Sequence, residues 1–150
     1  MLQRIQSIFL ILASAALLSL LSSSMLLIGV NGDSGGAGKL LSDGALTMPE
    51  DKILMGVGVS AAIIFFIAIF LYKNRPTQSK LVIAAVMLTI VMIILAALDV
   101  YANIEGMGGN ISLVPSIGSF IPFLVVLFGI LALRYIKKDE KLVRSMNRLR

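Results

Sequence analysis

The sequence contains no cysteine and no histidine. Without cysteine, the chain can form no disulfide and offers no thiolate as a nucleophile or metal ligand. Without histidine, it lacks the side chain that serves most often as a general base and as a metal ligand. We therefore expect a protein that is not an enzyme, with no catalytic residue, no metal site and no bound cofactor.

Charged residues are also scarce. They make up 14% of the chain, whereas hydrophobic residues make up 58%. A soluble domain carries about 25% charged residues and interrupts its apolar runs so that one face of each element stays in water. Tryptophan is absent, so an interfacial belt of aromatic side chains would depend on Tyr72, Tyr101 and Tyr135. This composition argues against a soluble fold.

Four long apolar stretches dominate what is present. They cover about residues 5–30, 53–72, 81–102 and 113–133. A stretch of roughly 20 apolar residues is long enough to cross a hydrocarbon core of ~30 Å as a helix. An isolated span in lipid must satisfy its own backbone hydrogen bonds, and only a helix does so. The sequence therefore predicts an all-α fold, a single membrane domain of four transmembrane helices in contact with the lipid bilayer.

The segments between the stretches are polar. Residues 31–52 are rich in Gly, Ser and Asp, which is typical of a flexible, solvated loop. The link 73–80 is short and contains Pro76, so we expect the second and third spans to form an antiparallel hairpin. The link 103–112 is a second turn containing glycine.

The first stretch has an alternative interpretation as a cleaved signal peptide, because a run of small residues, Ser22 to Ser24, follows its apolar core. The apolar stretch continues to Val30, however, and is longer than the usual 7–15-residue core of a signal peptide. We therefore expect a retained helix.

The distribution of basic residues predicts the orientation. Lys and Arg gather in the segments that remain on the cytoplasmic side of a membrane. The N-terminus, the 73–80 link and the C-terminal tail together hold 11 of the 13 basic residues, and only Lys39 and Lys52 lie on the other side. We expect both termini to be cytoplasmic.

Two terminal segments carry a resemblance. The chain opens with MLQRIQ (residues 1–6) directly before the first span, and closes with RYIKKDEKLVRSMNRLR (residues 134–150) directly after the last. With four spans in about 150 residues, these segments resemble a family of small four-span membrane proteins from bacteria of the Bacteroidetes type, a domain of unknown function (DUF4293). The resemblance covers the whole chain. It implies a bacterial inner-membrane location and a four-helix architecture, and it implies no activity.

The tail, residues 134–150, is predicted to be a cytoplasmic amphipathic helix. At 100° per residue its apolar side chains fall within an arc of roughly 140°. This arc contains Tyr135, Ile136, Leu142, Val143, Met146 and Leu149. The candidate contacts to a partner or to lipid are the basic residues Arg134, Lys137, Lys138, Lys141, Arg144 and Arg148. Such a helix can lie on an anionic leaflet, dock into a partner's groove, or only fix the topology.

One acid of the tail breaks the apolar arc. Asp139 lies inside it, where a carboxylate is costly against lipid and favourable against a cation. We therefore predict that Asp139 or Glu140 forms an ion pair with Arg4 or with Arg75. Such a pair would fold the tail against the cytoplasmic mouth of the bundle.

Asp99 is the ionisable residue that lies well inside a predicted span. Intramembrane acids are candidates for functional sites. Asp99 is near the outer end of its span, so the alternative is an acid that water reaches.

Pro115 and Pro122 in the fourth span could kink it, or Pro115 could lie in its first turn. Gly58 and Ala62, four residues apart, favour close contact between spans one and two, with dimerisation as the alternative.

These observations favour a multi-pass inner-membrane protein that acts as a non-enzymatic scaffold or accessory subunit of a membrane complex. Its partners would be another membrane protein or further copies of itself. The alternative is a small oligomeric transporter or channel component that uses Asp99. Nucleic-acid binding is not expected, because no aromatic stacking platform accompanies the basic tail.

Overall fold

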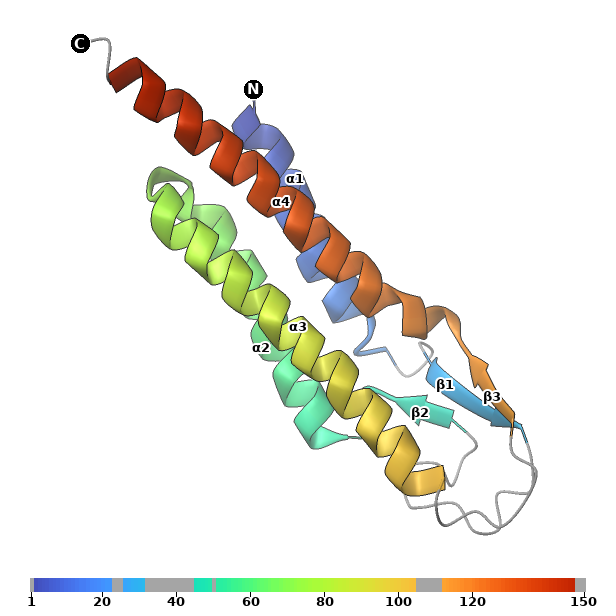
Figure 1. Cartoon of the computed structure of the whole chain (residues 1–150). Coiled ribbons are helices and arrows are strands. Elements are labelled where there is room, and N and C mark those ends of the chain that lie inside the picture. Colours follow the sequence, from blue (N-terminus) through green and yellow to red (C-terminus); the bar gives the residue numbers. More distant parts are fainter. Residues whose placement is uncertain (1, 23–25, 32–44, 50, 105–111, 148–150) are drawn as a thin grey trace.

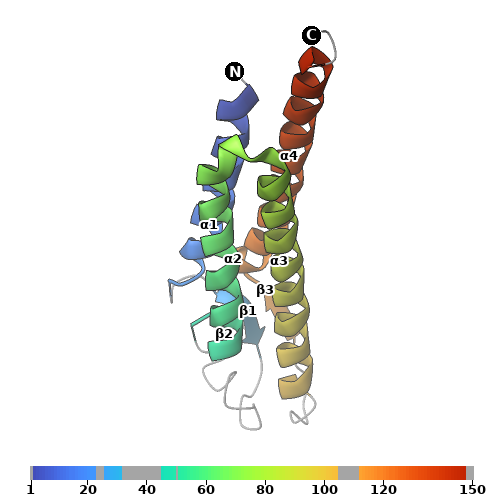
Figure 2. The same ribbon diagram turned by 90° about the vertical axis from the view of Figure 1, so that its left-hand side faces the viewer.

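The computed structural model describes residues 2–22, 26–31, 45–49, 51–104 and 112–147. Its body is an elongated bundle of four helices (Figure 1). They are α1 (Leu2–Ser19), α2 (Lys52–Phe70), α3 (Arg75–Ile104) and α4 (Ile117–Asn147). Both termini lie at one end of the bundle, together with the connection between α2 and α3 (Figures 1 and 2).

The four helices pack as a closed square. Helix α1 contacts α2 and α4, and α3 contacts the same two helices. Fully buried side chains from every helix fill the centre, among them Leu17 of α1, Phe65 of α2, Met92 of α3 and Val125 of α4. The helices therefore share one apolar core.

The outside of the bundle is apolar as well. Large hydrophobic side chains are exposed on every helix, for example Ile8, Phe66, Met87 and Phe123. Helices α2, α3 and α4 are long and apolar enough to cross a membrane, whereas α1 contributes a shorter apolar helix over residues 5–19. A surface of this kind fits a bilayer rather than water. The all-α fold class predicted from the sequence is confirmed, and the helices are those of a membrane protein.

The prediction of one helix over about residues 5–30 is wrong in its second half. Helix α1 ends at Ser19, and the backbone N–H groups of Leu20 and Leu21 bond three residues back, to Leu17 and Leu18. The apolar residues that follow form strand β1 (Leu26–Asn31). The rule that an isolated span must be helical does not apply here, because β1 obtains its hydrogen bonds from two neighbouring strands.

Strand β1 is the centre of a small antiparallel sheet with the order β2-β1-β3. Its partners are β2 (Ala45–Thr47) and β3 (Ser112–Pro115). In the register, Gly29 lies opposite both Ala45 and Val114. The sheet lies at the end of the bundle away from the termini (Figure 1). We call this end the sheet end.

The fourth predicted span, about residues 113–133, also begins as a strand. Pro115 lies in β3 opposite Ile28, so the prediction that it belongs to the fourth helix is wrong. Helix α4 begins at Ile117 and contains Pro122 in its interior.

The hairpin of the second and third spans has a tighter turn than predicted. A single 3₁₀ turn, η1 (Leu71–Lys73), follows α2, and α3 already begins at Arg75. Pro76 therefore lies in the first turn of α3, where its missing N–H has no helical partner to lose. The expected link of residues 73–80 is mostly helix.

Two glycines mark close approaches between elements. A Cβ at Gly58 would collide with Met48, which follows β2, and would lie 3.0 Å from the sulfur of Met92 in α3. The predicted contact between the first two spans is present, since α1 packs against α2, but the atoms nearest to Gly58 belong to Met48 and Met92. A Cβ at Gly129 of α4 would collide with Val86 of α3. These glycines let large side chains of neighbouring elements fill the core.

Candidate functional site

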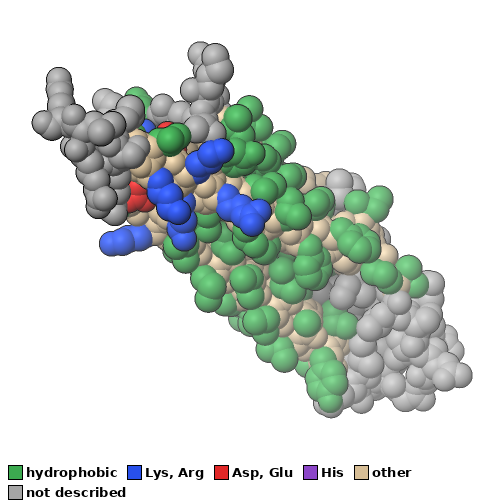
Figure 3. Space-filling view, turned by 45° about the horizontal axis from the view of Figure 1, so that its top comes forward, with side chains coloured by type: hydrophobic (Ala, Val, Ile, Leu, Met, Phe, Trp, Pro, Cys, Tyr) green, Lys and Arg blue, Asp and Glu red, His purple; other side chains and the backbone are tan. Residues whose placement is uncertain are grey.

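Basic side chains gather at the end of the bundle that holds the termini. Figure 3 shows them bordering hydrophobic surface, with acidic side chains beside them. The exposed members among the described residues are Lys80 of α3 and Arg134, Lys137, Lys138 and Lys141 of α4. We call this end the basic end. The basic residues that the sequence predicts on one side of the membrane thus lie together at one end of the bundle.

Helix α4 passes through the apolar body and continues beyond it without interruption. Its 31 residues correspond to about 46 Å, more than a hydrocarbon core of ~30 Å. The tail predicted to be helical is therefore the final part of α4 as far as Asn147. It follows the direction of the bundle (Figure 1) and does not turn sideways, as a helix lying flat on a leaflet would.

An ion pair holds this extension against the hairpin of α2 and α3. Arg75 Nη2 lies 3.0 Å from Asp139 Oδ2, and the two side chains are 25% and 15% exposed. Arg75 is the first residue of α3, so the contact joins the beginning of α3 to α4. This is one of the pairings proposed from the sequence. Glu140 is half-buried, and the side chain of Arg4 lies outside the described residues.

An aromatic stack attaches α4 to α1 at the same end. The ring of Phe9 stacks on Tyr135 with 5.6 Å between centroids and an interplanar angle of 16°. Phe9 also contacts Phe128 at 6.2 Å. The spacing of Phe128 and Tyr135, two helical turns apart, is the sequence signal that could have indicated this cluster. The sequence analysis had placed Tyr135 in an aromatic belt and in an amphipathic arc, and had not paired it with Phe9.

Two buried glutamines lie near this end. Gln78 of α3 is fully buried, and its Nε2 donates a hydrogen bond to the carbonyl of Ala68 in α2 at 2.9 Å. Gln6, part of the opening MLQRIQ segment, is 1% exposed, and among the described residues neither of its amide atoms has a hydrogen-bond partner. Gln78 therefore fixes the hairpin, and Gln6 places a polar group inside the bundle.

The predicted apolar arc of the tail lies on the side of α4 that faces the bundle, but its residues are buried to different degrees. Ile136 is fully buried in the bundle and Tyr135 is half-buried, whereas Leu142 is 46% exposed. At 100° per residue, Leu142 points within ~20° of Tyr135, so it lies on the same side of α4 but two turns nearer the C-terminal end of the helix. The outward face beyond the apolar body therefore consists mainly of lysines.

A family model described as a domain of unknown function (DUF4293) matches residues 2–149. This chain belongs to the DUF4293 family. The match includes both ends of the bundle and confirms the resemblance seen in the terminal segments. No curated protein and no solved structure matches the chain.

In this DUF4293 protein, Asp99 lies away from the basic end. It is half-exposed near the end of α3, and its carboxyl group is close to that of Asp51. Asp51 caps α2 by accepting a hydrogen bond from the backbone N–H of Ile53 at 2.8 Å. The structure thus brings two acids together, one of which the sequence analysis had not considered. Among the described residues, no group of three potential metal ligands is present.

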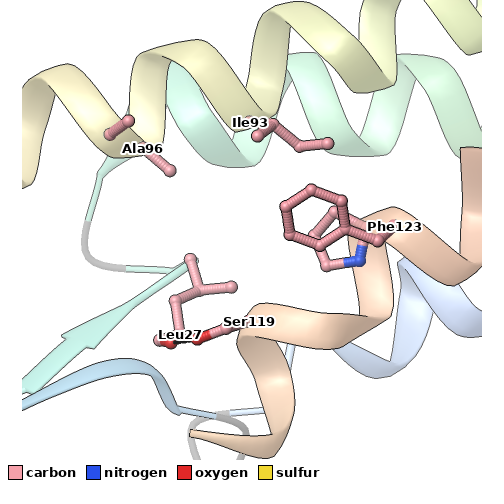
Figure 4. A pocket seen from close by; sticks show the side chains of 7 residues that line it. Leu27, Ile93, Ala96, Ser119 and Phe123 are labelled. Atoms are coloured by element: carbon pink, nitrogen blue, oxygen red, sulfur yellow. Dashed lines mark hydrogen bonds between the residues drawn. The ribbon is translucent and has the colours of Figure 1, made fainter. Parts of the chain in front are cut away.

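An apolar pocket of about 190 Å³ lies between α3, α4 and β1 (Figure 4). Ile93, Ala96 and Ala97 line it from α3, and Pro122 and Phe123 from α4. Among the lining residues, only Ser119 is polar, and its hydroxyl donates a hydrogen bond to the carbonyl of Leu27. This bond joins α4 to the central strand of the sheet.

The DUF4293 match also covers two predicted contact residues whose side chains the structure does not describe. The backbone of Arg144 belongs to α4, and Arg148 lies outside the described residues. The described basic surface of α4 therefore consists of Arg134, Lys137, Lys138 and Lys141.

Proposed function

We propose that this protein is a non-enzymatic scaffold or accessory subunit of an assembly in the bacterial inner membrane. In this proposal both termini are cytoplasmic, and the outward face of α4 beyond the apolar body is the surface that binds a partner. The partner is a membrane protein with an acidic cytoplasmic surface.

One observation carries the proposal: the side of α4 that faces the bundle is fixed by side-chain contacts, and the opposite side carries exposed basic residues. The ion pair between Arg75 and Asp139 and the stacking of Phe9 on Tyr135 hold its inner side. Lys137 and Lys141, one turn apart, are exposed on the outer side. A charged surface on a rigid helix loses less conformational entropy on binding than the same charges on a mobile tail. This favours a docking role over a tail that only fixes topology.

The orientation is part of the same proposal. The basic end contains both termini and the α2–α3 turn, and Lys and Arg favour the cytoplasmic side of a bacterial membrane. Cytoplasmic termini would place the lysines of α4 where the cytoplasmic segments of neighbouring membrane proteins can reach them.

The test is purification of the tagged protein from native membranes in mild detergent, with identification of co-eluting proteins. We expect a reproducible membrane-protein partner that is reduced several-fold by the double substitution Lys137→Gln and Lys141→Gln, because rim charges steer association. The matched control is the double substitution Lys52→Gln and Lys80→Gln, which removes two exposed charges elsewhere. The control should retain the partner.

A second candidate function is a small oligomeric transporter or channel component that uses Asp99. The proximity of Asp99 to Asp51 favours it, because neighbouring carboxylates can share a proton or a cation. The same purification separates the two functions. A homo-oligomer that elutes without a partner contradicts the scaffold and supports transport, and equal loss of the partner in both double variants contradicts docking through α4.

A further inference from the structure

The outward face of α4 contains a shallow groove that leads to the basic end. Its volume is about 300 Å³, and its lining is Phe123, Val126, Leu127, Ile130, Leu131 and Arg134. These positions recur every three or four residues, so they share one side of the helix. Val125 and Ala132, on the other side, are fully buried in the bundle. The groove therefore faces the surroundings of the protein.

The groove has the length of one leaflet. From Phe123 to Arg134 the helix rises about 16 Å, which is half of a hydrocarbon core of ~30 Å. Its lining is apolar until Arg134, the first cation of α4. Lys138 is also exposed and lies one turn further along the same face. The apolar groove therefore ends at two cations, where the hydrocarbon region would meet the lipid headgroups.

We propose that this groove binds one anionic phospholipid of the leaflet at the basic end. An acyl chain lies along Leu127 and Ile130, and the phosphate contacts Arg134, with Lys138 next to it. A guanidinium binds phosphate oxygens in a bidentate way, and cations next to a span attract anionic lipids. The inference rests on the proposed function in one respect, the placement of the basic end at the cytoplasmic leaflet.

Two other occupants fit the groove less well. A soluble phosphate would meet one cation and five apolar side chains, so most of the groove would contribute nothing to its binding. A second copy in the same orientation would bring Arg134, Lys138 and Lys141 against their own counterparts. Like charges facing each other oppose such a dimer.

Native mass spectrometry of the full-length protein in mild non-ionic detergent tests the site. The probes are dioleoyl phosphatidylglycerol and dioleoyl phosphatidylcholine, which have the same acyl chains, added at equal concentration. We expect one phosphatidylglycerol to be retained in preference to phosphatidylcholine. Arg134→Gln should lower this preference about fivefold, the effect of one basic residue near a membrane surface. Lys80→Gln, a cation at the same end that does not line the groove, should leave it unchanged.

A second variant tests the acyl-chain half without altering charge. Leu127→Trp fills the groove and should abolish the retained lipid, whereas Leu98→Trp, at an exposed position of α3, should not. Equal retention of both lipids, an unchanged preference in Arg134→Gln, or a stable dimer in place of a bound lipid overturns the proposal. Displacement of the lipid by millimolar glycerol 3-phosphate also overturns it, because the headgroup alone would then suffice.

The two proposals fail separately. If the unsubstituted protein shows no preference for phosphatidylglycerol but still co-elutes with its partner, the lipid site alone is contradicted. Loss of the partner in the variant with Lys137→Gln and Lys141→Gln, with the lipid still bound, shows that the docking surface and the groove are different parts of α4.

Discussion

The two ends of the bundle are held together in different ways. At the basic end, side chains make the contacts between helices: Arg75 pairs with Asp139, and Phe9 stacks on Tyr135. At the sheet end, β1 joins β2 and β3 through backbone hydrogen bonds, and Ser119 adds a side-chain bond to Leu27. A backbone ladder survives most single substitutions, whereas a contact between two side chains is lost with either of them. The basic end is thus the end where one substitution can release an element.

The largest expected loss of folding stability is for a substitution in the part of the core nearest the sheet end. Gly58→Val places a branched side chain against Met48 and Met92, where there is no room for it. We expect a loss of about 3 kcal/mol of folding stability, because overpacking forces strained rotamers or backbone shifts. Thermal unfolding in detergent, followed by circular dichroism, measures it. Gly56→Val is the control, since nothing lies within 4 Å of a Cβ at Gly56; equal destabilisation by both variants would show that the helix, rather than the close approach, is responsible.

The next largest loss of folding stability should come from breaking the ion pair at the basic end. Asp139→Ala leaves the Arg75 side chain, which is 25% exposed, without its partner, and we expect a loss of about 2 kcal/mol of folding stability, less than for a fully buried pair. The double variant with Arg75→Gln and Asp139→Asn removes both charges and should recover at least half of that loss. Spin-label distances between α3 and the extension of α4 measure release of the helix. An unchanged distance in Asp139→Ala would mean that the aromatic stack alone holds the extension.

The smallest effect should come from the polar contact at the sheet end. Ser119→Ala removes the hydrogen bond to the Leu27 carbonyl and should cost about 1 kcal/mol without detaching β1, because the strand keeps its backbone partners. Amide hydrogen exchange of residues 26–31 is the measurement. Ser60→Ala, whose hydroxyl bonds to Val57 within its own helix, is the control. Complete loss of protection over β1 would contradict the view that the ladder dominates this end.

The bundle itself could be predicted from the sequence because its signal is local. Residues 53–72 and 81–102 each contain enough apolar side chains to cross a membrane, and the structure has helices there. Asp139 could also be singled out locally, as a carboxylate inside an apolar arc. Its partner could not: Arg4 and Arg75 were equally suitable by charge, and the tertiary structure is what places Arg75 3.0 Å from Asp139.

The sheet could not be predicted by the same reasoning. Residues 26–31 are as apolar as a helix in lipid, and nothing local distinguishes them from the end of a longer span. Their strand conformation depends on residues 45–47 and 112–115, which are distant in the sequence and offer matching backbone donors and acceptors. A rule that treats each stretch as isolated misses such pairing.

Composition and order of residues by themselves determined that this chain has helices apolar enough to cross a membrane, that consecutive helices are antiparallel, and that its positive charge gathers at one side. These properties follow from transfer free energies, which each segment carries with it. Only the tertiary structure decided that α1 stops at Ser19, that Arg75 meets Asp139, and that α4 turns its cations outward. Those properties depend on which distant groups become neighbours, and that is set by the packing of the whole chain.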